Sequence, residues 1–472
     1  MEVQFTNDKF YGFFDKKFIY KLQLFALFSL GITLLISFFK YENLFYFVIF
    51  IFLLHLIIFL RTRNFIYIIF ALIFAMFFDI DNVFTFGGKF YLRIWYFIPL
   101  VFISWKSISF LQKNSLLNIK INAFPLFFLF SLLYFSTASL LLTGNKIEAV
   151  MFFSKLLFFY VPIIFIFVLE LRKEYLPYVI LYFIFMIFWV SLFGIAQFIS
   201  AYYGLLYFQY EYDLRPQGFF SETSWMGIAS TFGIIFSLLS YSITQRKKYL
   251  FLTIPMFVIF VLSATRGAYL SMGIAIPALF ISGTSKEKKG MAALLFLLFF
   301  TILILKLTLG ELYNLITYIS MRLFSIQDIS ALGRLEGYRL NLKYISKNLL
   351  TGLGFGFNEV IRGSGSIIGA KSFNIFFAVL NSIGIFGFIA FLCGLLNFLI
   401  KYLISAIKCK IKNCKIILVH GFLGSIVWLI YSQNAPLHLY PFGWLVLGLV
   451  ISIYANVNYR TCEFYAYCKL ER

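Results

Sequence analysis

Long runs of apolar residues recur along this 472-residue chain, and they limit its possible folds more than any other feature. A helix needs about 20 consecutive apolar residues to cross the hydrocarbon core of a bilayer. By that criterion we expect about 14 membrane-spanning helices. They are predicted at residues 20–39, 42–60, 64–79, 92–110, 122–143, 149–170, 175–201, 224–243, 249–265, 267–282, 290–309, 373–400, 415–433 and 441–457.

The composition agrees with a membrane protein. Hydrophobic residues make up 62% of the chain and charged residues 12%, whereas soluble domains average about 45–50% and about 25%. A soluble fold would have to hide more apolar surface than a compact protein of this size can bury. We therefore predict an all-α polytopic integral membrane protein with a single domain over residues 1–472. Its two main loops outside the membrane are predicted at 203–223 and 310–372.

The basic residues predict the orientation of the chain. With the amino end inside, nearly every loop expected on the cytoplasmic side is short and basic, as the positive-inside rule requires. Both termini are then cytoplasmic. The polar amino end leads into a span of full length, which indicates a signal anchor and not a cleaved signal peptide. The formal charge of +21 suggests an anionic partner, but no basic run is dense enough to indicate a nucleic acid.

The five cysteines do not predict a disulfide framework. All but one of them fall in segments expected to be cytoplasmic, where thiols stay reduced. Cys462 and Cys468 lack the spacing and the nearby histidine of a zinc site. We expect no metal and no cofactor.

Arginines collect on the side expected to face outwards. The positive-inside rule favours basic residues on the cytoplasmic side, so it does not explain arginines on the outer side. A guanidinium presents a planar fork of donors that matches phosphate oxygens in pairs. The alternative is that these arginines cap helix ends or reach towards lipid headgroups. The group comprises Arg93, Arg215, Arg266, Arg322, Arg334, Arg339 and Arg362.

Two of these arginines lie beside predicted helix starts. Arg215 lies in the loop 203–223, which ends in Glu222 and enters a helix. A helix amino end favours an anion, and the alternative is that the carboxylate of Glu222 serves only to stabilise that helix end. Arg266 lies in a turn too short to extend into solvent. It is therefore predicted near the bilayer surface, at the depth of a lipid pyrophosphate.

The long loop 310–372 carries Arg334 and Arg339, followed by a glycine-rich run. Gly352, Gly354 and Gly356 permit close approach of the backbone to a ligand, or they form a flexible turn that re-enters the membrane. No Gly-Lys-Ser/Thr follows, so the run is not a P-loop.

Two further outer segments carry candidate groups. His438, in the loop 434–440, is the only histidine predicted on the arginine face, and is a candidate base or an interfacial residue. Asp79 and Asp81 have a spacing that suits a shared divalent cation, or they simply close a helix.

The order of these motifs, over roughly 200–390, resembles the O-antigen polymerase and O-antigen ligase superfamily of bacterial surface-polysaccharide assembly. The similarity rests on Arg215-x-x-Gly218-Phe219-Phe220-x-Glu222-x-Ser224, Thr265-Arg266-Gly267, Gly333-Arg334, Leu350-x-Gly352-x-Gly354-x-Gly356, Phe373-Asn374 and Gly384-x-x-Gly387. Ligases of this superfamily usually have a histidine just before the asparagine, where this chain has Ser372-Phe373. Polymerases often have a glutamate at the place of Glu222. Both points favour a Wzy-type polymerase.

The resemblance implies a GT-C-like fold in the bacterial inner membrane, with the active site on the periplasmic face. Its substrates are an undecaprenyl-pyrophosphate-linked glycan donor and an acceptor on the same lipid. Membrane lipids and a chain-length regulator are further expected partners. We assign Arg215, Arg266 and Arg334 to the pyrophosphate, with Arg339 next, and expect Gly354 and Asn374 to contact substrate. Glu222 is the candidate base and His438 its alternate.

Two other functions remain open on the sequence. One is a flippase or another multispanning carrier, which would show internal halves and charges along the membrane midplane. The other is a metal-dependent transferase that uses Asp79 and Asp81, whose activity EDTA would abolish.

Overall fold

The computed structural model describes a large part of the chain. The described residues are 41–62, 64–77, 84–86, 90–92, 94–113, 150, 153–203, 216, 220, 223–283, 285, 288–293, 295–296, 299–300, 329–354, 374–433 and 441–457.

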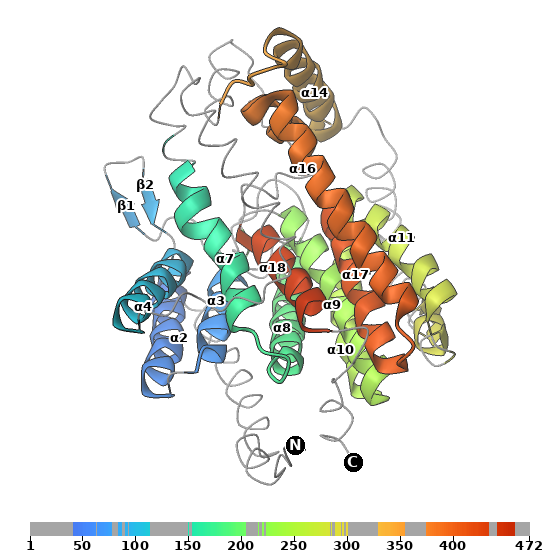
Figure 1. Cartoon of the computed structure of the whole chain (residues 1–472). Coiled ribbons are helices and arrows are strands. Elements are labelled where there is room, and N and C mark those ends of the chain that lie inside the picture. Colours follow the sequence, from blue (N-terminus) through green and yellow to red (C-terminus); the bar gives the residue numbers. More distant parts are fainter. Residues whose placement is uncertain are drawn as a thin grey trace, which may run out of the picture.

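This part of the protein is helical (Figure 1). The helices are α2 (Tyr41–Thr62), α3 (Ile66–Phe77), α4 (Phe97–Lys113), α7 (Val161–Phe165), α8 (Leu176–Tyr203), α9 (Thr223–Thr244), α10 (Lys248–Leu262), α11 (Arg266–Ser282), α14 (Ile329–Lys347), α16 (Ile375–Lys408), α17 (Lys412–Ser432) and α18 (Pro441–Asn456). A 3₁₀ turn, η1 (Ile94–Tyr96), precedes α4, and the π-helical segments η2 (Leu156–Tyr160) and η3 (Ile166–Glu170) flank α7.

One short hairpin departs from the all-α prediction. Strands β1 (Phe84–Phe86) and β2 (Phe90–Leu92) pair antiparallel, with Phe84 opposite Leu92. Aromatic residues favour strands. In the sequence the two strands are separated by three residues, Gly87, Gly88 and Lys89, and a three-residue connection with glycine is common in hairpins.

The helices coincide with most of the predicted spans. Each of α2 to α4, α8 to α11 and α16 to α18 overlaps a predicted apolar segment, and η2, α7 and η3 together overlap 149–170. The predicted spans 20–39 and 122–143, and most of 290–309, lie outside the described residues.

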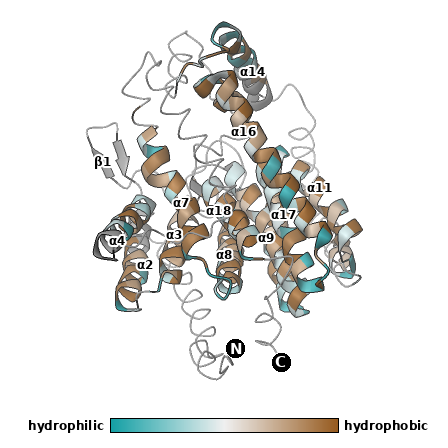
Figure 2. Cartoon of the chain, viewed as in Figure 1, coloured by the Kyte–Doolittle hydropathy of each residue, from teal (hydrophilic) through white to brown (hydrophobic). Residues whose placement is uncertain are grey.

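Among the described residues, five helices are long and apolar enough to cross a membrane: Phe153–Glu170, Leu176–Ser200, Ser224–Thr244, Ile375–Lys408 and Lys412–Ser432. Shorter apolar helices accompany them. Many large apolar side chains are exposed, among them Phe50, Ile57, Phe251 and Ile407. Most helices are coloured as hydrophobic in Figure 2, whereas α14 is more hydrophilic. These features support a helical multi-pass membrane protein. The total of about 14 spans and the GT-C-like architecture remain predictions.

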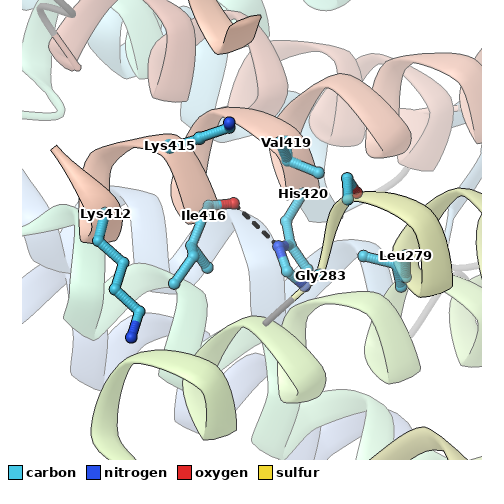
Figure 3. A pocket seen from close by; sticks show the side chains of 8 residues that line it. Leu279, Gly283, Lys412, Lys415, Ile416, Val419 and His420 are labelled. Carbon is cyan, nitrogen blue, oxygen red and sulfur yellow. Dashed lines mark hydrogen bonds between the residues drawn. The ribbon is translucent and has the colours of Figure 1, made fainter. Parts of the chain in front are cut away.

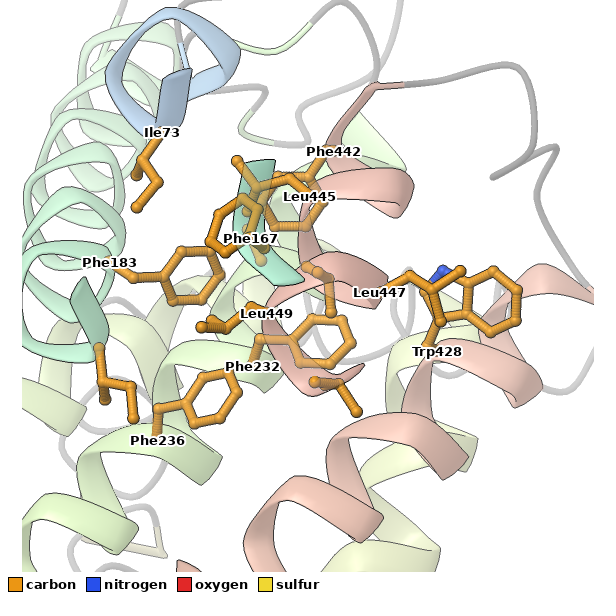
Figure 4. Close-up of a cluster of buried hydrophobic side chains, with 14 of the residues drawn as sticks. Ile73, Phe167, Phe183, Phe232, Phe236, Trp428, Phe442, Leu445, Leu447 and Leu449 are labelled. Carbon is orange, nitrogen blue, oxygen red and sulfur yellow. The ribbon is translucent and has the colours of Figure 1, made fainter. Parts of the chain in front are cut away.

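The core of the bundle is aromatic. Phe183 of α8, Phe236 of α9 and Phe442 of α18 meet there, with the Phe183 ring 5.7 Å from that of Phe236 and 6.1 Å from that of Phe442 (Figure 4). Offset and edge-on ring contacts at these separations favour aromatic packing. Helix α9 is the most buried of the five long apolar helices, with 89% of its apolar stretch inside the protein.

The expectation about cysteines is wrong at one position. Cys414, in the first turn of α17, is disulfide-bonded, whereas Cys393 and Cys409 are free thiols. Cys393 is exposed and Cys409 is buried. The expectation rested on the predicted compartment alone, and spacing along the chain cannot say which cysteines approach each other in space.

Candidate functional site

Helix α16 is broken near its amino end, and the glycine-rich run packs into the break. Gly384 has φ 69° and ψ −174°, which no helical residue adopts. Leu353 N donates to Asn381 O at 2.5 Å and Gly354 N to Ser382 O at 3.1 Å, while Ile385 N donates to Leu349 O at 2.8 Å. These bonds use backbone groups that an interrupted helix would otherwise leave unpaired. The segment 349–354 therefore joins the two parts of α16.

The segment 349–354 approaches α16 so closely that only glycine fits at positions 352 and 384. Gly352 has φ 71°, and a Cβ there would lie 2.7 Å from the backbone nitrogen of Gly384. A Cβ on Gly384 would meet the carbonyl oxygen of Leu350 at less than contact distance. The backbone that approaches Gly352 is thus that of α16. Gly354 has φ 77° and its N–H donates to Ser382, so its predicted contact with substrate stays a prediction.

Helix α14 is fixed to the same part of α16 by a buried polar pair. Asn381 Nδ2 donates to Asn341 Oδ1 at 2.6 Å, and Asn341 Nδ2 donates to the carbonyl of Gly337 at 2.6 Å. Both asparagines are almost fully buried. The ring of Tyr338 lies 5.4 Å from that of Phe377, which adds an apolar contact. Helix α14 is therefore packed against the amino-terminal part of α16.

The two candidate arginines of α14 occupy positions on different sides of the helix. Both Arg334 and Arg339 lie within the helix, five positions apart, which places them about 140° apart around its axis. Arg339 is exposed. The backbone position of Arg334 is described, but its side chain lies outside the described part of the structure.

Asn374 caps α16. Its Oδ1 accepts hydrogen bonds from Phe376 N at 2.8 Å and Phe377 N at 3.4 Å. A side-chain oxygen at this position satisfies helix N–H groups that have no partner within the helix. The Asn374 side chain therefore has a structural role as the cap of α16. Its predicted contact with substrate stays a prediction.

Arg266 is the first residue of α11, directly after a strained turn. Ala264 has φ 44° and Thr265 is extended. The turn packs against Gly227 of α9, where a Cβ would lie 2.5 Å from Ser263 Oγ and 2.8 Å from Thr265 Oγ1. Gly227 lies about one helical turn beyond the start of α9. The turn thus places Arg266, which is partly buried, near the amino end of α9.

Two tyrosine hydroxyls connect these elements at one end of the bundle. Tyr431 Oη, in the last turn of α17, donates to the carbonyl of Ser224 at the start of α9, at 2.7 Å. Tyr338 Oη of α14 donates to the carbonyl of Gln433, just after α17, at 3.2 Å. The amino ends of α9 and α11, the carboxyl end of α17 and helix α14 therefore belong to the same end of the molecule (Figure 1).

The remaining candidates lie outside the described residues. These are Arg215, Glu222 and His438, the acidic pair Asp79 and Asp81, and three further arginines of the predicted group, Arg93, Arg322 and Arg362. Two neighbours of Arg215 and Glu222 are described. Pro216 is buried, close to Gly194 of α8, and the Phe220 ring lies 5.8 Å from that of Phe442. Among the described residues, no group of three His, Cys, Asp or Glu side chains could hold a metal ion.

Sequence reasoning missed the residues that hold this end together. Asn341, Asn381, Gly227 and Tyr431 act through contacts with residues far away in the sequence. The amide of Asn381 lies within an apolar helix, and a buried amide needs a hydrogen-bond partner. The sequence could therefore have predicted that Asn381 bonds to another polar group. Nothing local identified that partner as Asn341.

Comparison with known families gives one match. Residues 251–392 match the Wzy_C family, described as O-Antigen ligase. The match runs from α10 through the Arg266 turn and α14 to the break in α16. It supports the O-antigen polymerase and ligase superfamily, and with it a role in O-antigen or polysaccharide assembly.

The Wzy_C match does not distinguish polymerase from ligase. It is consistent with an enzyme that acts on lipid-linked glycans. None of the curated proteins matches the chain.

Proposed function

We propose that this protein is a glycosyltransferase that polymerises undecaprenyl-pyrophosphate-linked repeat units into O-antigen or a related surface polysaccharide. The observation that carries the proposal is the clustering inside the Wzy_C match. The Arg266 turn, the arginine-bearing helix α14 and the broken helix α16 all fall within residues 251–392 and belong to one end of the bundle. We place this end on the periplasmic face of the inner membrane, with both termini in the cytoplasm.

In the proposed reaction, a hydroxyl of the acceptor glycan attacks the anomeric carbon of the donor chain. A new glycosidic C–O bond forms, and the bond from that carbon to the pyrophosphate oxygen breaks. Undecaprenyl pyrophosphate leaves with the bonding electrons, and the hydroxyl proton passes to Glu222, or to His438 as the alternate base. The leaving group is a stable anion, so the main electrostatic requirement is compensation of its charge.

Guanidinium groups meet this requirement without a metal. Arg266 lies at the amino end of α11, where the helix dipole also favours an anion. Arg215 and Arg334 are proposed to complete the pyrophosphate site. Arg334 and Arg339 lie on different sides of α14. One of them can therefore bind the pyrophosphate of the donor and the other that of the acceptor.

The decisive experiment replaces Arg266 or Arg334 by alanine and follows chain growth on purified lipid-linked repeat units. We expect long chains to be lost, with a fall in rate of about 10²-fold or more, while the supplied one-repeat glycolipid stays unextended. Lysine in either place should restore little activity, because the paired donors are lost.

Arg246→Ala is the matched control for these variants. Arg246 follows the far end of α9 and is exposed. It should leave chain length unchanged. Normal chains in Arg266→Ala and Arg334→Ala would remove these arginines from the proposed site.

A ligase is the second candidate, because the matching family is described as O-Antigen ligase. The polymerase is favoured by Ser372-Phe373 before Asn374 and by Glu222, as argued from the superfamily resemblance. The surface glycans of a deletion strain separate the two. Single-repeat caps indicate a polymerase, and bare lipid core with accumulated polymer indicates a ligase. Loss of every exported repeat would indicate a flippase instead.

A further inference from the structure

A pocket lies at the opposite end of α17 from the candidate site. It has a volume of about 150 Å³ and is lined by the carboxyl end of α11 and the amino end of α17. At about 30 Å³ per water molecule, this volume holds about five waters, which is room for a phosphate group. The lining residues are Leu279, Ser282, Gly283, Lys412, Lys415, Ile416, Val419 and His420.

The pocket is basic. Lys412 and Lys415 are exposed, and no acidic residue is among the lining residues. Figure 3 shows that the two lysines leave α17 in different directions. Each side chain has four rotatable bonds, so both ammonium groups can turn to the pocket mouth. The amino end of α17 adds partial positive charge at the same place.

The inner wall of the pocket is apolar and ordered. Leu279 and Ile416 are buried. The His420 ring lies beneath α17 towards Gly283 (Figure 3), and its Nδ1 donates to the carbonyl of Ile416 at 2.9 Å, which fixes the ring. A ligand that fits this pocket must therefore carry an anionic group, which contacts the lysines, and an apolar part, which contacts the inner wall.

The surroundings of the pocket point to lipid as the source of that anion. Ile281, next to Ser282, is 83% exposed, and Ile411, next to Lys412, is 40% exposed. Both helices carry apolar surface of the kind that faces acyl chains. Basic pockets between membrane helices at the membrane surface are known to bind anionic headgroups.

We propose that this pocket binds the phosphate group of an anionic phospholipid, in the leaflet on the side away from the candidate glycosyltransfer site. Lys412 and Lys415 contact the phosphate, and the acyl chains lie along the apolar surface near Ile281 and Ile411. The inference does not depend on the polymerase proposal, because the pocket shares no residue with that site.

The test is native mass spectrometry of the purified full chain in detergent, titrated with phosphatidylglycerol or phosphatidylcholine. We expect the wild-type protein to retain one phosphatidylglycerol with a preference of about tenfold over phosphatidylcholine. Lys412→Gln combined with Lys415→Gln should abolish that preference. Both lysines are exposed, so the substitutions should not disturb folding.

The matched control is Lys408→Gln combined with Lys410→Gln. These lysines are exposed, precede α17 and do not line the pocket. The control should keep the preference. Equal losses in both double variants would mean diffuse attraction to the surface, and no loss in Lys412→Gln with Lys415→Gln would remove the site. Either result overturns the proposal.

A second variant and a competitor address the pocket itself. Val419→Phe fills the pocket while keeping both lysines, and should reduce phosphatidylglycerol retention as the charge variants do. Glycerol 3-phosphate and inorganic phosphate at millimolar concentration should not compete. Full displacement by either one would show a site for soluble phosphates and would contradict a lipid ligand.

Discussion

Gly352 and Gly384 form one contact between segments that are distant in the sequence. Each adopts a positive φ, and each approaches the backbone around the other so closely that a Cβ would collide. A glycine is therefore required twice at the same place, once on each chain segment. This contact holds the end of α14 to the break in α16, beside the residues of the candidate site.

We expect Gly352→Ala and Gly384→Ala each to destabilise the protein. The left-handed backbone alone costs about 1–3 kcal/mol for a residue with a Cβ, and the collision with backbone atoms adds to it. The measurement is thermal unfolding of the purified protein in detergent, with chain polymerisation as a second readout.

Gly273→Ala is the control for these substitutions. Gly273 lies inside α11, and a Cβ there meets nothing within 4 Å. Alanine at this position should leave the melting temperature unchanged or raise it. Melting temperatures of Gly352→Ala and Gly384→Ala equal to that of Gly273→Ala would contradict the packing described at the break.

At the scale of elements, α14 is a helix outside the long apolar spans that is positioned by a few specific contacts. The buried pair of Asn341 and Asn381 lies at the centre of its contact with α16, and Tyr338 reaches the end of α17. A buried hydrogen bond contributes little net stability, but leaving one partner unpaired is costly. The pair therefore determines the position of α14 on α16 more than it stabilises the contact between the two helices.

This predicts a non-additive double-mutant cycle. Asn341→Leu leaves the amide of Asn381 without its acceptor, at a cost of about 1–3 kcal/mol. Asn381→Leu should cost a similar amount, and the double variant should cost clearly less than the sum, by at least about 0.5 kcal/mol. Unfolding of the purified protein measures each variant.

Asn348→Leu provides the comparison for this cycle. Its side-chain amide donates to the carbonyl of Tyr344, one helical turn earlier in the same segment, at 3.3 Å. It should cost less than either single variant. Strict additivity of Asn341→Leu and Asn381→Leu would show that the two amides do not interact.

At the scale of the whole molecule, the two ends of the bundle differ in their charged residues. Arg266 and Arg339 belong to the end with the candidate site. At the other end, Lys408 ends α16, Lys412 begins α17 and Lys410 lies between the two helices. The positive-inside rule predicts that the end with Lys408, Lys410 and Lys412 faces the cytoplasm.

Thiol labelling tests this sidedness. In a background with the five native cysteines replaced by alanine, a membrane-impermeant maleimide should label Arg339→Cys in intact spheroplasts. It should label Lys410→Cys only after the membrane is opened. Both positions are exposed, so access to the reagent is limited by the membrane and not by the fold. The reverse pattern would invert the proposed orientation and place the arginines in the cytoplasm.

Apolar runs by themselves determined the class of this protein and the positions of most of its helices, because a bilayer demands a fixed length of apolar helix. They placed α9 and α11 within a few residues of their observed ends, and the motif order predicted the superfamily that the match to residues 251–392 supports. Local sequence suffices for these features because each depends on residues close together in the chain.

Only the tertiary structure decided how the candidate residues are held. The break at Gly384, its closure by the segment 349–354 and the pairing of Asn341 with Asn381 join residues that are far apart in the chain. It also showed that two residues predicted to contact substrate have structural tasks, since the Asn374 side chain caps α16 and the Gly354 N–H bonds to Ser382. Their contact with substrate stays a prediction. Such contacts depend on which backbone groups an interrupted helix leaves unpaired, and that is set by the fold as a whole.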